Sequence, residues 1–63
     1  MKRIAVLFAD GVEESEALTI VDILRRAEMD AKIVGVPGRE ILGAHQISIQ
    51  ADVMIKELRR IFR

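Results

Sequence analysis

A short apolar run that leads through a tight turn into an acid-rich segment constrains the fold most. Residues Arg3 to Ala9 are almost continuously apolar, and Asp10-Gly11 separates them from the glutamates Glu13, Glu14 and Glu16. An apolar run without alternation is typical of a parallel strand covered on both faces, and the turn residues favour a change of element. We therefore predict a central strand followed by a helix. Ligands and catalytic groups collect at such strand ends in open α/β sheets.

The segment from Glu14 to Ala27 predicts an amphipathic helix. Its apolar side chains recur at intervals of three and four residues: Ala17, Leu18, Val21, Leu24 and Ala27, with Ile20 widening the stripe. Acids at its start and Arg25 and Arg26 at its end match the helix dipole. Asp30 to Val36 then reads as a second strand, which Pro37-Gly38 ends with a turn. Together these segments predict a right-handed βαβ unit.

The remaining residues predict a hairpin and a second helix. Ile41-Leu42 and residues 47–50 are short apolar or alternating pieces around Gly43-Ala44-His45, the pattern of a small hairpin. Asp52 is suited to cap a helix from Val53 onward. The apolar side of that helix would consist of Met54, Ile55, Leu58, Ile61 and Phe62. We expect a single truncated α/β unit over residues 1–63, with the order β-α-β-β-β-α. So narrow a sheet leaves exposed edges that normally pair with further strands.

Composition argues against several function classes. Ten basic and ten acidic side chains cancel, so no net field favours nucleic acid or an anionic membrane as a partner. The cluster of Arg59, Arg60 and Arg63 is better explained as a solvated helix face, because no aromatic platforms accompany it. The sequence has no cysteine, and therefore no disulfide or thiol nucleophile of its own. With neither a signal-peptide pattern nor a long apolar run, we expect a cytoplasmic protein.

The glutamates of the turn are the first candidates for chemistry. Neighbouring carboxylates at a buried turn can have raised pKa values and act as an acid or a base. Glu13 and Glu14 are explained more simply as acids that the helix dipole favours. Glu16 differs, because its spacing from Ala17 and Ile20 lets its side chain point toward the sheet.

Other polar residues have simple structural explanations. His45 is the single histidine, and a lone hairpin histidine is usually a solvated turn residue, because metal sites need several ligands. We therefore predict no metal site and no cofactor. Arg25 and Arg26 could hold an anion but are better explained as helix-end cations. Asp10 and Asp52 follow strands as the acids of a phosphorylation receiver do, although Asp52 is better explained as a helix cap.

The turn and its flanking elements resemble a known family. Residues 2–27, with the motif Gly-x-Glu-Glu-x-Glu-Ala, look like the amino-terminal end of the ThiJ/PfpI superfamily, the group that contains the parkinsonism-associated deglycase. Lys32 to Val36 and Gly43 to Asp52 match the same family in order, so the resemblance covers nearly the whole chain. It implies part of a flavodoxin-like sandwich, of the class I glutamine amidotransferase type, which is commonly dimeric.

The resemblance also implies an activity. Relatives carry out cysteine-dependent glyoxalase, deglycase or peptidase-like hydrolase chemistry, and the last carboxylate of the turn hydrogen-bonds the reactive cysteine, which places that role on Glu16. His45 lies where relatives carry a basic residue near the active-site mouth and the dimer contact. The candidate binding residues around that mouth are Glu13, Glu14, Arg26 and His45.

Departures from the family pattern limit what the chain can do alone. The family's Pro-Gly-Gly loop, nucleophile elbow and later histidine are missing from the sequence, so we predict no turnover by this mechanism. Glu28 stands where relatives usually have Gly at the end of the helix. If the backbone there is left-handed, the loss of this glycine cap lowers the folding stability by about 1 kcal/mol. The alternative function is a noncatalytic module that docks on a second copy or a complementary half-chain through its sheet edges and the stripe of Met54, Leu58 and Phe62.

Overall fold

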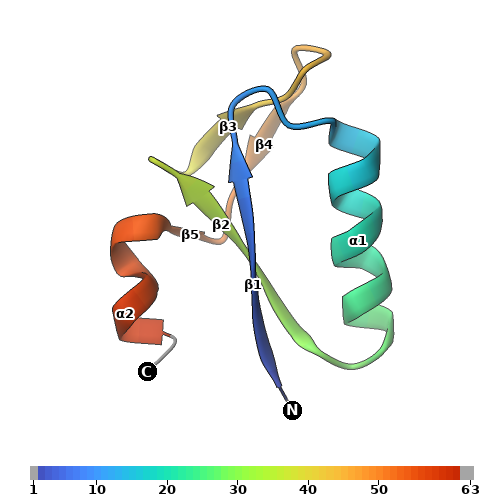
Figure 1. Cartoon of the computed structure of the whole chain (residues 1–63), viewed down its shortest axis with the longest axis vertical. Coiled ribbons are helices and arrows are strands. Elements are labelled where there is room, and N and C mark those ends of the chain that lie inside the picture. The colour runs from blue at the N-terminus through green and yellow to red at the C-terminus, as the bar shows by residue number, and fades with distance from the viewer. Residues whose placement is uncertain (1, 62–63) are drawn as a thin grey trace.

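The computed structural model describes residues 2–61 and confirms the predicted βαβ unit. The elements are β1 (Arg3–Ala9), α1 (Glu14–Arg26), β2 (Asp30–Val36), β3 (Glu40–Leu42), β4 (Ser48–Gln50), β5 (Val53–Met54), the 3-10 turn η1 (Ile55–Glu57) and α2 (Leu58–Ile61). Figure 1 shows α1 on one side of the β1–β2 pair and the short α2 on the other. No helix within residues 2–61 has the length and apolar character needed to cross a membrane.

The main sheet has three parallel strands in the order β1-β2-β5. β1 pairs with β2 along its full length, and β5 pairs with the end of β2, where Val34 lies opposite Val53. Among the described residues β2 is therefore the central strand, and our prediction that β1 is central is wrong for this part of the chain. The difference shows in burial, since Val34 of β2 is completely buried whereas Leu7 of β1 is 57% exposed.

The predicted hairpin is confirmed, but it forms a separate sheet. β3 and β4 pair antiparallel with Ile41 opposite Ile49. Both isoleucines are buried in one cluster with side chains of α1 and of the main sheet. The core that results consists of Phe8, Ala17, Val21, Ile33, Ile41, Ile49 and Ala51. The hairpin thus closes one end of the βαβ unit instead of widening its sheet.

The helix predicted from Val53 onward begins later than expected. Val53 and Met54 form β5, which suits a β-branched residue, and α2 begins only at Leu58. Asp52 is not a helix cap. Its Oδ2 accepts hydrogen bonds from the backbone N–H of Ile33 at 2.8 Å and from Arg25 at 2.9 Å, so it connects β2 to the end of α1. The last residue of the predicted apolar stripe, number 62, lies outside the described residues.

The end of α1 confirms that Glu28 occupies a left-handed position. Its φ is 64°. The N–H of Glu28 donates to the carbonyl of Arg25 at 3.0 Å, and the N–H of Met29 donates to that of Leu24 at 3.1 Å. This pair of bonds is the Schellman motif, whose left-handed residue is most often glycine. A glutamate here carries strain that glycine avoids.

Candidate functional site

Backbone hydrogen bonds hold the hairpin against the turn between β1 and α1. Gly11, in the left-handed region with φ 92°, donates its N–H to the carbonyl of Leu42 at 2.8 Å. The N–H of Leu42 in turn donates a hydrogen bond to Oδ1 of Asp10 at 3.0 Å. The N–H of Ala44 donates to the carbonyl of Val12 at 2.8 Å. The carboxylate of Asp10 therefore has a structural role, as does that of Asp52.

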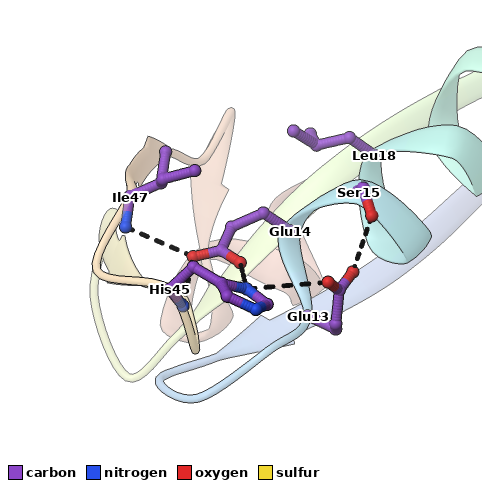
Figure 2. A pocket seen from close by; sticks show the side chains of 6 residues that line it. All are labelled: Glu13, Glu14, Ser15, Leu18, His45 and Ile47. Atoms are coloured by element: carbon purple, nitrogen blue, oxygen red, sulfur yellow. Dashed lines mark hydrogen bonds and ion pairs between the residues drawn. The ribbon is translucent and has the colours of Figure 1, made fainter.

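Glu14 is the buried carboxylate of this turn, with 4% of its surface exposed. Its Oε2 accepts hydrogen bonds from the backbone N–H groups of His45 at 2.8 Å and Ile47 at 3.2 Å, and its Oε1 lies 2.8 Å from Nδ1 of His45. Figure 2 shows the loop curving around the carboxylate. A side chain at Gly43 would bring its Cβ within 2.1 Å of Oε2. The loop is thus built around Glu14.

The electrostatics of the site favour an ion pair between Glu14 and His45. Burial raises the pKa of Glu14, but hydrogen bonds from the His45 ring and from the backbone N–H groups of Glu14, His45 and Ile47 together outweigh it and lower the pKa to about 2. The hydrogen bond to Glu14, followed by the charges of Glu14 and Glu13, raises the pKa of His45. As an imidazolium, His45 donates its Nδ1–H to Glu14.

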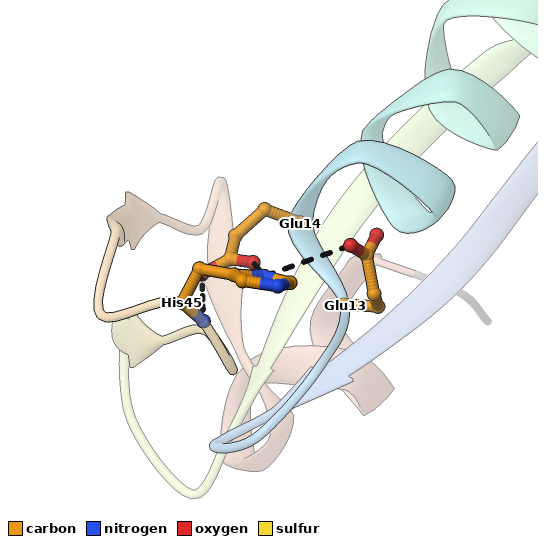
Figure 3. Close-up of side chains that lie close together, drawn as sticks. All are labelled: Glu13, Glu14 and His45. Atoms are coloured by element: carbon orange, nitrogen blue, oxygen red, sulfur yellow. Dashed lines mark hydrogen bonds and ion pairs between the residues drawn. The ribbon is translucent and has the colours of Figure 1, made fainter.

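Glu13 caps α1 and faces the same histidine. Its Oε1 accepts hydrogen bonds from the backbone N–H of Glu16 at 2.8 Å and from the hydroxyl of Ser15 at 2.9 Å. These two bonds, the backbone one first, lower the pKa of Glu13. Its other oxygen, Oε2, lies 3.6 Å from Nδ1 of His45. Figure 3 shows the imidazole between the two carboxylates.

The expectation that Glu16 points toward the sheet is wrong. Glu16 is exposed, and Glu14 is the inward carboxylate. The residues of α1 that face the core are Glu14, Ala17 and Val21, which share one helix face through their spacing of three and four residues. Glu16 lies about 200° around the helix axis from Glu14. The spacing of Glu14 from Ala17 and Val21 is visible in the sequence and would have identified it. The role of Glu16 beside a cysteine stays a prediction.

Arg26 lies away from Glu13, Glu14 and His45. The prediction that it lies with them at the active-site mouth is therefore wrong for this structure. Arg26 pairs with Asp22 through Nε and Oδ1 at 3.1 Å, one turn back on the same helix. The 13 residues of α1 place its two ends about 20 Å apart. Arg25, at that same far end, binds the carbonyl of Ala31. The structure therefore gathers Glu13, Glu14 and His45 and leaves both arginines outside.

An open pocket of about 400 Å³ adjoins the three side chains. Its lining consists of Glu13, Glu14, Ser15, Leu18, His45 and Ile47 (Figure 2). Leu18 and Ile47 supply an apolar wall, and the carboxylates and imidazole supply a polar one. The pocket has the size and mixed lining of a small-ligand site.

Fold and turn together define part of a flavodoxin-like α/β fold, with acidic side chains at the carboxyl end of its first parallel strand. The model of the DJ-1/PfpI family matches residues 2–60. The chain belongs to that family, which confirms the resemblance seen in the sequence.

Individual relatives agree with this assignment. The chain is 32% identical over 59 residues to protein DJ-1 homolog B of Arabidopsis thaliana, covering 92% of this chain and 14% of that protein. It superposes on a mutant of a DJ-1 superfamily protein from Salmonella typhimurium with a TM-score of 0.87 and 37% identity. For oxidized DJ-1 of Toxoplasma gondii the TM-score is 0.89 and the identity 26%. Each superposition covers 97% of this chain and 34% of the other, so the chain spans about a third of these solved relatives.

Proposed function

We propose that the chain supplies the amino-terminal third of a DJ-1/PfpI-type catalytic domain, with Glu16 as the carboxylate that tunes a cysteine located outside these 63 residues. The observation that supports this proposal is the exposed position of Glu16 on the first turn of α1. Its backbone N–H is bonded to Glu13, which fixes the turn. Within residues 2–61 no hydrogen bond or ion pair reaches its carboxylate, so that group is free to meet a further segment of the domain.

The proposed chemistry is cysteine-dependent attack on a reactive carbonyl or acyl group. The thiolate sulfur bonds to the carbonyl carbon while the carbonyl oxygen takes the electron pair. A carboxyl group beside the sulfur sets the thiolate fraction and the orientation of the nucleophile. Because the sequence contains no cysteine, the 63-residue chain alone should catalyse no such reaction. Glyoxalase, deglycase and peptidase-like hydrolysis are the activities to test.

The experiment measures methylglyoxal consumption with the chain alone and with the cysteine-bearing remainder of a DJ-1 superfamily relative. We expect no consumption above buffer for the chain alone and measurable consumption for the mixture. Glu16→Gln should lower the rate of the mixture at least about tenfold, an effect of about 1.4 kcal/mol on the barrier. Glu40→Gln, a change on the exposed face of β3, is the matched control. Activity of the isolated chain that disappears in Glu16→Gln would overturn the proposal.

A second candidate function is a noncatalytic association module. Several large apolar side chains are exposed on residues 2–61, among them Leu7 at 57%, Ile20 at 53% and Ile23 at 59%. β1 also has one edge without a partner strand in the described part of the chain. Open edges and exposed apolar area favour pairing with another strand or chain. A second copy, giving a homo-oligomer, or a complementary half-chain would cover them.

Sedimentation equilibrium with circular dichroism on the same sample tests this second function. A folded dimer or larger assembly supports it, and Leu7→Lys should then shift the population toward monomer. Leu42→Lys, at an exposed residue of the hairpin, is the control for an added charge. A folded monomer at high concentration would exclude the association module. The cytoplasmic location stays a prediction from the sequence.

A further inference from the structure

Glu13, Glu14 and His45 each offer one ligand atom around a common point. These atoms all lie within 4.8 Å of one another. Nδ1 of His45 is 2.8 Å from Oε1 of Glu14 and 3.6 Å from Oε2 of Glu13 (Figure 3). Ligand atoms in a tetrahedral zinc site, with bonds of about 2.0 Å, lie about 3.3 Å apart. We propose that these three side chains bind a divalent transition-metal ion such as Zn²⁺.

The hydrogen bonds of the two carboxylates leave the proposed ligand atoms available. One oxygen of each group is held by backbone N–H groups: Oε1 of Glu13 by Glu16, and Oε2 of Glu14 by His45 and Ile47. The other oxygen of each group faces the imidazole. Hydrogen bonds of this kind orient metal ligands without occupying the donor atom. Only the proton on Nδ1 has to leave for the ion to enter.

Charge balance also favours a divalent ion. Two carboxylates and an imidazolium carry one net negative charge, whereas two carboxylates, a neutral imidazole and a divalent ion carry none. The positive end of the α1 dipole opposes any cation, and the two carboxylates offset it. The His45 side chain is 65% exposed and borders the open pocket. A water molecule or a ligand can therefore take a fourth coordination position.

The donor set indicates the kind of metal. One imidazole nitrogen and two carboxylate oxygens suit Zn²⁺ and its neighbours in the first transition series, whereas Ca²⁺ and Mg²⁺ prefer oxygen ligands alone. The sequence argues against a metal because His45 is its single histidine. The fold removes that objection, since it brings two glutamates from the start of α1 to the hairpin loop.

The test is calorimetric titration of the tag-free 63-residue chain with Zn²⁺ at neutral pH, in a buffer that does not bind zinc. We expect one ion per chain. His45→Ala and Glu13→Gln should each weaken binding at least about tenfold, equivalent to about 1.4 kcal/mol. Asp22→Asn, which removes a carboxylate from the far end of α1, should leave the affinity unchanged. Circular dichroism of each variant separates lost ligation from lost folding.

A second readout needs no variant. In NMR spectra of the unmodified chain, the ring signals of His45 should shift on addition of Zn²⁺ and return on addition of a chelator. The proposal is overturned if Zn²⁺ at about 1 mM, the weak end of specific binding, produces no heat and no shift. It is equally overturned if His45→Ala binds as tightly as the unmodified chain, or if Asp22→Asn weakens binding as much as Glu13→Gln. The result is independent of the cysteine chemistry proposed above, because no activity is measured.

Discussion

The carboxylate of Glu14 and the imidazole of His45, which are 31 positions apart in the sequence, meet at 2.8 Å between Oε1 and Nδ1. This contact joins the first turn of α1 to the loop of the β3–β4 hairpin. One of the two side chains is buried and the other is largely exposed. The pair therefore links the core to the pocket surface, and its strength should determine how firmly the hairpin is attached.

Replacing Glu14 with Gln should lower the melting temperature of the chain. A glutamine amide has one acceptor oxygen, whereas Glu14 uses two oxygens to accept from two backbone N–H groups and the His45 ring. At least one buried donor then loses its partner, which costs more than an exposed hydrogen bond contributes. Glu13→Gln, at a half-exposed position, should have a smaller effect. Equal melting temperatures for Glu14→Gln and the unmodified chain would contradict the role of Glu14.

The stability of the chain should be greatest between about pH 4.5 and 6.5. The pKa of Glu14 falls from 4.5 to about 2 on folding, so its contribution is complete above pH 4.5 and is lost as the pH falls toward 2. The pKa of His45 rises from 6.5, so its contribution is complete below pH 6.5 and is lost as the pH rises through the higher value. Within residues 2–61, Glu13 and Glu14 are the charged groups that face the ring.

Urea unfolding at a series of pH values, with a chelator present, measures both limbs of this profile. His45→Gln should flatten the decline above pH 6.5 and keep much of the acid limb, since the backbone N–H groups still hold Glu14. A profile of His45→Gln that keeps the full decline above pH 6.5 would show that another group is responsible.

Sequence pattern is sufficient to predict β1, α1, β2 and the hairpin, and it contains the spacing that places Glu14 on the buried face of α1. Apolar spacing predicts β1, α1, β2 and the hairpin because each element covers one face with aliphatic side chains. The choice between Glu14 and Glu16 depends on which residues of α1 face the core: Ala17 and Val21, three and seven positions from Glu14, place Glu14 inward, and Glu16 lies about 200° around the axis from it. The partners of Glu14 come from the hairpin loop, a contact across 31 positions that local pattern does not encode.

The carboxyl-terminal region shows a second limit of local pattern. Asp52 before an apolar stretch predicts a helix cap, yet its carboxylate is used by Ile33 and Arg25. The parallel pairing of Val53 with Val34 competes with helix formation. Tertiary contacts with β2 therefore delay the helix until Leu58. A propensity argument that considers only neighbours in the sequence misses such competition.

Glu28→Gly should stabilise the chain by about 1 kcal/mol. Glu28 has a φ of 64° at the end of α1, where glycine has no steric cost. Glu28→Ala keeps the left-handed strain and should give little or no gain, so it separates the backbone effect from removal of the charge. Urea unfolding midpoints at constant pH provide the comparison. Equal stabilisation by Ala and Gly would attribute the effect to charge.

Gly43→Ala should destabilise the chain by about 2 kcal/mol through overpacking. A methyl group at Gly43 would lie 2.1 Å from Oε2 of Glu14 and 2.3 Å from its Cδ, so either the buried carboxylate or the hairpin loop must move. Gly38→Ala is the matched control, because a methyl group there meets nothing within 4 Å. The melting temperature should fall for Gly43→Ala and stay nearly constant for Gly38→Ala. The His45 ring signals in NMR spectra should also shift toward those of a free imidazole in Gly43→Ala alone, since displacement of Glu14 breaks the ion pair. Similar behaviour of the two variants would mean that the loop is not built around Glu14.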